Sequence, residues 1–187
     1  MGVIETKSIF CVKFNKMKKG FTLIELLVVI AIMSILTVIT VSQFQTAKKK
    51  ANDVARKGDL NAVAKALQMY YADYGKMPDM SDPLGGEIKV GANVIPWGGE
   101  FIDGANFVYM QKLPQENDYP ALPQYCYKTD VDNKAYALFA MLENTQDSQC
   151  INGAAPTYQC GNPIEKYCFA YYSPNIKLDP TNGNIIF

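Results

Sequence analysis

The residues that could carry chemistry in this 187-residue chain are few, and histidine is not among them. The missing histidines exclude Ser-His-Asp catalysis and histidine metal sites, and no nucleophile has an activating base. Oxygen ligands lie on two predicted turns: Asp130 with Asp132, and Asp179 with Asn182 and Asn184. The second group is a weak calcium candidate, because its spacing does not fit an EF-hand and turn formation explains the same residues.

The cysteines offer a second kind of chemistry. Cys11 stands apart near the start, and four others lie in the C-terminal part. An even number in a loop-rich region predicts two disulfides in an oxidising compartment, with four buried free thiols as the alternative. Of three pairings we favour Cys126–Cys168, both in predicted strands, and Cys150–Cys160, which bracket a loop.

The element that positions the one unusual carboxylate is a long apolar segment. From Phe21 to Val41, Glu25 is the only charged residue. At about 1.5 Å per residue this segment matches the roughly 30 Å hydrocarbon layer of a membrane. Apolar side chains on every side disfavour a buried core helix, and the length disfavours a cleaved signal peptide. We predict a transmembrane helix over residues 21–42. The basic residues on its two sides are equal in number, so the positive-inside rule does not decide the orientation. The cysteines indicate that the larger, C-terminal part lies on the exported side.

The start of this segment carries a specific pattern, Lys18-Lys19-Gly20-Phe21-Thr22-Leu23-Ile24-Glu25. It resembles the leader-peptidase site of type IV pilins and type II secretion pseudopilins. The resemblance implies that residues 1–20 are a cleaved basic leader. It also implies cleavage between Gly20 and Phe21 by a prepilin peptidase, followed by N-methylation of Phe21. Met17 is an alternative start that would give a shorter leader.

Glu25 has a physical reason to act in assembly. A carboxylate at membrane depth costs at least about 2.5 kcal/mol and needs a partner. Cleavage would create an amine on Phe21, and the amine of a neighbouring subunit could pair with Glu25. An out-of-register subunit would then leave a charge unpaired in an apolar core. The alternative is a carboxyl group that snorkels or stays protonated.

The helix is expected to continue beyond the membrane over residues 43–75. Apolar and small residues recur at three- and four-residue spacing, from Phe44 through Ala51, Val54 and Ala55 towards Tyr74 and the stop signals that follow. We expect this stripe, which also contains Gly58, to pack closely on a sheet. The helix ends in a Tyr-x-x-Asp-x-Gly-x-x-Pro pattern between residues 70 and 78, which is similar to the major pseudopilin of type II secretion.

Residues 76–187 read as a strand-rich head. Short strands are expected at 88–90, 93–95, 125–128, 134–142, 167–172 and 185–187. Residues 130–133 form a predicted turn, which makes the third and fourth strands a hairpin. A helix on an antiparallel sheet is the expected α+β solution, pilin-like in its arrangement.

Charge is unevenly divided along the chain. Residues 48–65 contain six basic and two acidic side chains, whereas seven basic and 14 acidic side chains follow from residue 66 onward. The basic segment suits anionic lipid head groups or the acidic head of a neighbour, with a plainly solvated face as the alternative. The acidic head argues against nucleic-acid binding.

The leading functional interpretation is a structural subunit, held in the inner membrane with its head exported and then assembled with copies of itself into a type II secretion pseudopilus. The resemblance implies prepilin peptidase, an inner-membrane assembly platform and an ATPase as partners. The alternatives are a type IV pilus subunit for adhesion, motility or DNA uptake, and a minor tip pilin that acts as a binding module. A membrane-anchored enzyme is the third class, and the absent motifs disfavour it.

Overall fold

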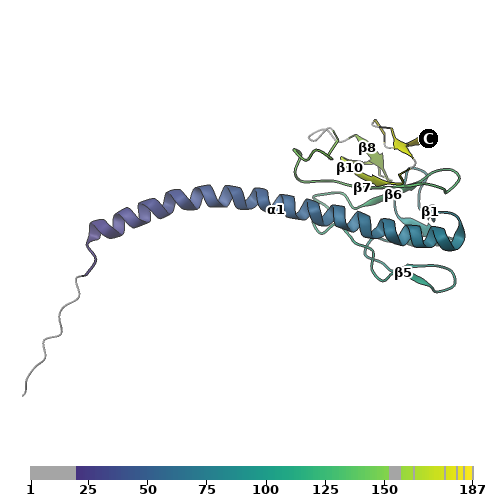
Figure 1. Cartoon of the computed structure of the whole chain (residues 1–187), viewed down its shortest axis with the longest axis horizontal. Helices are drawn as coiled ribbons and strands as arrows, with labels where there is room; N and C mark the ends of the chain where they lie inside the picture. Colours follow the sequence, from purple (N-terminus) through teal and green to yellow (C-terminus); the bar gives the residue numbers. More distant parts are fainter. Residues whose placement is uncertain are drawn as a thin grey trace, which may run out of the picture. The chain divides into compact units, whose positions relative to one another are not determined.

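The computed structural model describes residues 20–151, 157–161, 163–174, 176–179, 181–182 and 184–186, without the side chains of residues 39–42. Residues 1–19 of the predicted leader, which include Cys11 and Met17, lie outside the described residues. The chain forms two units, Met1–Ser42 and Gln43–Phe187 (Figure 1). Most of the described contacts that define the fold are in the second unit.

One helix, α1, runs from Leu23 to Tyr74. It ends as predicted, because Gly75 adopts a φ of 68° and its N–H donates to the Tyr71 carbonyl at 2.8 Å. A residue with positive φ at this position closes many helices, and glycine adopts it without steric cost. The predicted single helix is therefore confirmed to within two residues of its start.

The strands are short and all their pairings are antiparallel, which confirms the α+β class. The main sheet has the order β10-β7-β6, and a second sheet has the order β1-β2-β3. In the C-terminal unit, the main sheet and the β4–β5 hairpin flank the helix (Figure 1). The strand bounds are β1 Asp79–Met80, β2 Ile88–Val90, β3 Asn93–Ile95, β4 Phe101–Ile102, β5 Val108–Met110, β6 Cys126–Thr129, β7 Tyr136–Ala140, β8 Tyr158–Cys160, β9 Glu165–Tyr167, β10 Phe169–Tyr172, β11 Lys177–Leu178 and β12 Ile185–Ile186.

The predicted hairpin is confirmed as β6 and β7, with Thr129 opposite Tyr136. Its turn is held by Asp130, whose Oδ1 accepts hydrogen bonds from the backbone N–H groups of Lys134 and Ala135 at 2.7 and 2.8 Å. Both strands are buried along their whole length, because the sheet is covered on both faces. This is why β7 is apolar at every position rather than alternating, whereas β6 ends in the buried polar residues Lys128 and Thr129.

The strand expected over residues 167–172 is instead two strands, β9 and β10, which meet at Cys168. The Cys168 carbonyl accepts a hydrogen bond from Ile151 at 2.7 Å, and its sulfur is bonded to Cys150. These contacts with the preceding loop take Cys168 out of the strand pairing. Strands β1, β4, β5, β8 and β11, which have two or three residues each, were not predicted.

The face of α1 that packs on the sheets differs from the predicted stripe in its first part. Buried side chains lie at Val63, Leu67 and Tyr70, as expected, and form one core with residues of the sheets. Leu60, which the predicted stripe did not include, belongs to the same core. Farther back along the helix the apolar residues Phe44, Ala51, Val54 and Ala55 are exposed, and this part of the prediction was wrong.

The buried face continues instead through two charged residues, Asp53 and Arg56, which are 2% and 4% exposed. Their spacing of three, and of four from Arg56 to Leu60, keeps them on one side of the helix. Gly58 lies off this face, and a Cβ added there would meet no atom within 4 Å. Gly58 therefore does not serve the close approach of a sheet that the sequence suggested.

Candidate assembly site

The first turn of α1 places Glu25 by a capping box. Thr22 precedes the helix, and its backbone N–H and Oγ1 hydroxyl donate to Glu25 Oε2 at 2.8 and 2.9 Å. In return the Glu25 N–H donates to Thr22 Oγ1 at 3.3 Å. The Thr-x-x-Glu spacing produces this reciprocal pair, which satisfies backbone N–H groups that the helix itself leaves unbonded.

Sequence reasoning selected Glu25 for its charge in an apolar segment and did not identify this capping box. The signal was present, because a threonine three residues before a glutamate at the start of an apolar run is the capping-box signature. Only Oε2 of Glu25 takes part in the hydrogen bonds given for this turn. The geometry therefore fixes the rotamer of Glu25 while leaving Oε1 available to a second molecule.

The predicted processing bond lies just before the helix. Gly20 and Phe21 are both outside α1 and both exposed, and a Cβ at Gly20 would meet no atom within 4 Å. A peptidase has to bind its substrate in an extended form, so an exposed bond ahead of the first helical turn is sterically open to it. The structure places Gly20, Phe21 and Glu25 within one short stretch.

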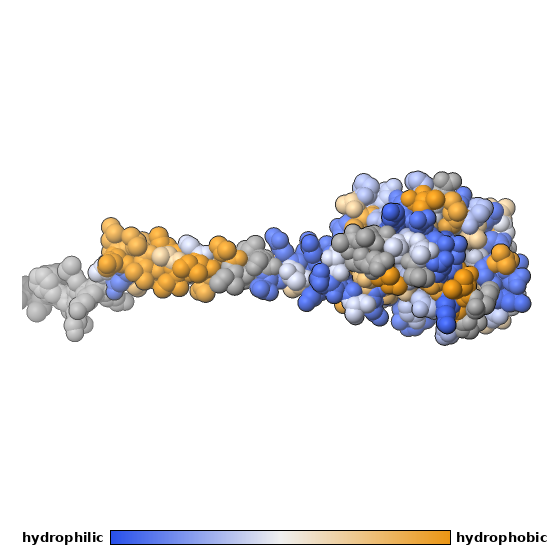
Figure 2. All heavy atoms as spheres, turned by 90° about the horizontal axis from the view of Figure 1, so that it is seen from above, coloured by the Kyte–Doolittle hydropathy of each residue, from blue (hydrophilic) through white to orange (hydrophobic). Residues whose placement is uncertain are grey.

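The helical segment that follows exposes its apolar side chains. Every described side chain from Phe21 to Val38 is exposed, and Phe21 has 89% of its surface open. In Figure 2 this segment is seen as a continuous apolar surface. Among the described helices, α1 is long and apolar enough to cross a membrane. An apolar surface of this extent requires lipid or other protein around it, which fits membrane anchoring.

The two disulfides are present, but the favoured pairing was wrong. The bonds are Cys126–Cys160, from β6 to β8, and Cys150–Cys168, from a loop to the β9–β10 junction. Strand β7 lies between β6 and β10, so Cys126 and Cys168 are on strands two positions apart. Two strand spacings amount to about 9.5 Å, whereas bonded cysteines need Cα atoms within about 7 Å.

A buried ion cluster in the head was also not predicted. Arg56 Nε donates to Glu116 at 2.6 Å, and its Nη1 atom donates to Asp53 and Glu143, both at 2.9 Å. Nη2 contacts Asp118 at 3.1 Å. Burial works against the charge of Arg56, but the hydrogen bonds that it donates to Glu116, Glu143 and Asp53 outweigh this effect and raise the pKa of the guanidinium.

This cluster ties the helix to two distant loops. Asp53 accepts backbone hydrogen bonds from Glu143 and Asn144 at 2.9 and 2.8 Å, while Arg56 holds Glu116. Lys57 adds an ion pair with Asp147 at 2.7 Å. Part of the basic segment expected to face lipid or a neighbour is therefore bound within the chain, and Lys48, Lys49 and Lys50 remain exposed.

The oxygen atoms of the weak calcium candidates take part in hydrogen bonds within the chain. Asp179 Oδ1 accepts hydrogen bonds from the N–H and hydroxyl of Thr181 at 2.8 and 2.6 Å, and these bonds lower the pKa of Asp179. Asn184 Oδ1 accepts from Lys128 Nζ at 3.2 Å, which puts a cation beside it. The described residues contain no group of three acidic, cysteine or histidine side chains arranged for a metal, and asparagine side chains, which two of the candidates have, are not among those groups.

Comparison with known proteins identifies the N-terminal segment first. Residues 15–41 match the family described as "Prokaryotic N-terminal methylation motif". This match covers the predicted leader end, the processing bond and the apolar helix. It therefore covers the segment whose described side chains, from Phe21 to Val38, are exposed.

Full-length relatives extend the likeness into the head. Type II secretion system core protein G of Vibrio cholerae is 33% identical over 110 residues, which cover 58% of this chain and 74% of the relative. The protein of the same name in Pseudomonas aeruginosa is 36% identical over 75 residues, 40% of this chain and 53% of that one. The type IV wide pilus major component PilA4 of Thermus thermophilus is 47% identical over 55 residues, 29% and 42% respectively.

The chain thus spans about half the length of the Pseudomonas and Thermus relatives and about three quarters of the length of the Vibrio relative. No solved structure matches it significantly. The family match itself is confined to residues 15–41, which include the capping box and most of the apolar part of the helix.

Proposed function

The chain belongs to the family of type II secretion system core protein G, and on that premise we propose that it is a structural subunit of a helical filament, the pseudopilus of type II secretion. The observation that carries the proposal is the pairing of an exposed apolar helix with one capped carboxylate at its start. The relatives are pilins and pseudopilins rather than enzymes.

The assembly step follows from the chemistry at residues 20–25. Cleavage after Gly20 frees the amine of Phe21, and methylation leaves it cationic. The Oε1 atom of Glu25 takes no part in the capping box. It can accept a hydrogen bond from the Phe21 amine of a neighbouring subunit. The apolar surfaces of the two helices then pack against each other, and the charge pair selects the register in which both charges are satisfied.

The remaining partners follow from this proposal. Prepilin peptidase removes the leader, the protein rests in the inner membrane with its head exported, and an assembly platform driven by an ATPase adds it to the filament in the periplasm or at the cell surface. The disulfides support an oxidising compartment for the head.

A type IV pilus subunit is the second candidate, supported by the likeness to the Thermus pilus component. Both candidates share the apolar helix and the processing site, so those features do not separate them. Export of a secreted enzyme in a strain that lacks this chain separates them: loss of secretion with normal surface pili supports the pseudopilus. A minor tip pilin would instead be found at only the filament end by immunogold labelling.

The first experiment tests processing. Intact-mass measurement on protein extracted from membranes should show a chain that begins at Phe21 and carries one added methyl group. A mature chain that starts at Met1, Met17 or Gln43 would contradict the family mechanism.

The second experiment tests the carboxylate. Glu25→Val should still insert and be cleaved, because it makes the span more apolar and leaves the Gly20–Phe21 bond unchanged. The affinity of a subunit for the filament should fall at least a hundredfold, and filament yield should fall with it, since an unpaired member of a buried charge pair costs about 3–5 kcal/mol. Glu25→Asp should give a milder defect, and Ile24→Val, which changes only apolar volume, should assemble normally. Normal filaments from Glu25→Val would refute the register mechanism.

Calcium binding at Asp179, Asn182 and Asn184 stays a prediction. Its support is the presence of three oxygen side chains on one turn, and its obstacle is the Lys128 ammonium at Asn184. Thermal unfolding of the oxidised chain with calcium and with EGTA tests it. A midpoint that rises with calcium in the wild type but not in Asp179→Asn would support binding.

A further inference from the structure

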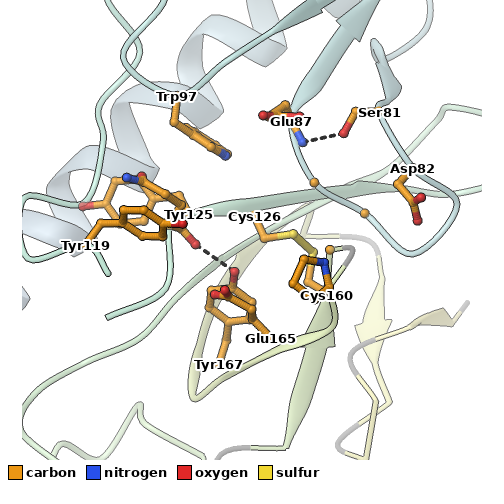
Figure 3. Close-up of a pocket in the computed structure, with 15 residues that line it drawn as sticks. Ser81, Asp82, Glu87, Trp97, Tyr119, Tyr125, Cys126, Cys160, Glu165 and Tyr167 are labelled. Carbon is orange, nitrogen blue, oxygen red and sulfur yellow. Dashed lines mark hydrogen bonds between the residues drawn. A yellow bond between two sulfur atoms is a disulfide. The ribbon is translucent and has the colours of Figure 1, made fainter. Parts of the chain in front are cut away.

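The head contains two cavities of similar size that differ in what surrounds them. One, of about 440 Å³, lies over the disulfide Cys126–Cys160 (Figure 3). Tyr125 and Tyr167 beside it are buried, and their hydroxyl groups donate to other parts of the head. These rings serve the packing of the head. The other cavity, of about 480 Å³, lies between α1 and residues 118–122, and most of the side chains around it are exposed.

The second cavity joins an apolar wall to a cation without an ion pair. Leu122 lies on one side of it and Lys48 of α1 on the other. Lys48 is exposed, and no ion pair within the described part of the chain involves it. Asp118 and Glu143 also line the cavity, but both contact the guanidinium of Arg56, at 3.1 and 2.9 Å. The ammonium of Lys48 is therefore available to a second molecule.

The far end of the head presents an exposed aromatic ring on a firmly held turn. Phe107 follows the turn between β4 and β5, and 52% of its surface is open. Asp103 Oδ1 accepts the backbone N–H groups of Ala105 and Phe107, both at 2.8 Å. Its Oδ2 accepts the hydroxyl of Tyr74 at 2.8 Å, which ties the turn to the end of α1. The ring is thus held at a fixed place on the surface.

A carboxylate lies close to this ring. The hydroxyl of Tyr109 donates to Asp73 Oδ2 at 2.8 Å, and the Tyr109 ring meets Phe107 edge to face at 4.9 Å between centroids. Asp73 is exposed and belongs to none of the ion pairs among the described residues. This end of the head therefore offers an apolar ring and an acid, whereas the cavity offers an apolar wall and a base.

The ring and the cavity lie along one side of α1. The segment that follows β5 runs back along the helix, because Met110 shares a small cavity with Ala62 and Leu122 shares the larger one with Lys48. Lys48, Ala62 and Asp73 are separated by 14 and 11 residues, close to four and three turns of about 3.6 residues, so they share one face. The 25 residues from Lys48 to Asp73 span about 38 Å at 1.5 Å each.

From this arrangement we infer that Phe107 of one subunit enters the cavity between α1 and residues 118–122 of a second copy, where Asp73 pairs with Lys48. A displacement of about 38 Å along the helix brings the two surfaces to the same level. Each subunit uses one surface towards one neighbour and the other surface towards another. Contacts of this head-to-tail kind repeat in an open helical array instead of closing. The inference rests on the proposed filament function and adds a contact between heads to the one at Glu25.

Cross-linking tests which surfaces meet. Ala105→Cys and Ala121→Cys change small exposed residues beside the ring and at the cavity. In the mature chain the four native cysteines are bonded to one another. Sheared filaments of the double variant, treated with a short bis-maleimide, should give a ladder of dimers, trimers and larger species. Each single variant should remain monomeric, and so should Ala105→Cys combined with Lys65→Cys, because Lys65 is exposed on α1 away from the cavity.

Charge reversal tests the pairing of Asp73 with Lys48. Lys48→Glu or Asp73→Lys alone should raise the ratio of unassembled to assembled subunit at least fivefold, because like charges then face each other. The two changes in one chain should return the ratio to that of the wild type. Phe107→Ala should raise it at least tenfold, since a buried aromatic anchor is lost, whereas Phe107→Tyr should have little effect. Near-ultraviolet circular dichroism confirms that each variant is folded.

The outcomes separate this contact from the filament itself. Filaments of the double-cysteine variant that give no ladder, or a double reversal that assembles no better than the single ones, would overturn the contact and leave the proposed function standing. Dimers from Ala105→Cys alone would show that ring meets ring, which also overturns it. A wild-type chain that forms no filaments would instead contradict the proposed function.

Discussion

The membrane-side segment of α1 and the head differ in where their contacts are found. From Phe21 to Val38 every described side chain is exposed, and the hydrogen bonds given there are local ones within the helix, such as Thr22 with Glu25. In the head, two disulfides and the buried residues Asp53 and Arg56 join segments up to 91 residues apart. The first region needs other molecules to bury it, whereas the second is complete by itself.

This difference means that mutations should separate into two classes. Changes in the apolar segment should affect assembly and leave the folding of the head intact. Changes in the head should affect folding and leave insertion and cleavage intact. The following predictions test that division, and the effect of the Glu25 variants described above belongs to the first class.

Arg56→Ala should have the largest effect on the head. It leaves Asp53 and Glu116 buried without their cation, and removing one partner of a buried ion pair costs about 3–5 kcal/mol. Urea unfolding followed by Trp97 fluorescence should show the loss, while membrane insertion and cleavage are unchanged. Lys50→Ala is the control, because Lys50 is exposed. A wild-type midpoint for Arg56→Ala would show that the cluster does not hold the loops to the helix.

Loss of the disulfides should come next. Peptide mapping without reduction should recover Cys126–Cys160 and Cys150–Cys168. Changing both cysteines of either pair to serine should lower the free energy of unfolding by about 3–4 kcal/mol, with a slightly larger loss for the longer 126–160 loop. Recovery of Cys126 joined to Cys168 would contradict the order of strands in the main sheet.

Thr22→Ala should have a smaller effect on stability, confined to the membrane-side segment of α1. It removes the side-chain half of the capping box and should cost about 1 kcal/mol at the helix start. Hydrogen exchange should become faster for the first-turn amide groups, with no change in the unfolding of the head. Thr22→Ser keeps the hydroxyl and should restore slow exchange. A destabilised head in Thr22→Ala would break the division between the two regions.

The smallest predicted effect is on the pH dependence of the head. The hydrogen bond from Lys57 lowers the pKa of Asp147, and a backbone hydrogen bond from Gln149 adds to this. The folded chain then binds fewer protons than the unfolded chain near pH 4, so this stabilisation is present above that pH and is lost as the pH falls through the lowered pKa.

Lys57→Gln should therefore flatten the fall in stability with acid. The change should be below about 1 kcal/mol at neutral pH, because both partners are partly exposed. Unfolding midpoints measured from pH 7 down to pH 3 give the profile, with the exposed Lys65→Gln as control. Identical profiles for Lys57→Gln and wild type would exclude this ion pair as a source of acid sensitivity.

The sequence by itself determined the features that depend on neighbours along the chain. The apolar run is a continuous stretch of sequence, and the processing pattern before Glu25 and the stop at Gly75 each lie within one or two helical turns. For the same reason the β6–β7 hairpin and strands β2 and β3 were found close to their observed bounds. The capping box could also have been found this way, since Thr22 and Glu25 are three residues apart.

Only the tertiary structure decided the features that depend on which segments meet. Cysteine pairing required the strand order, which places β7 between Cys126 and Cys168. The buried face of α1 required the carboxylates of distant loops, because Arg56 is tolerated in the core only where Glu116, Asp118 and Glu143 surround it. A local pattern ranks side chains by their own polarity, whereas the free energy of burying a charge depends on partners that the chain supplies from about 60 and 90 residues away.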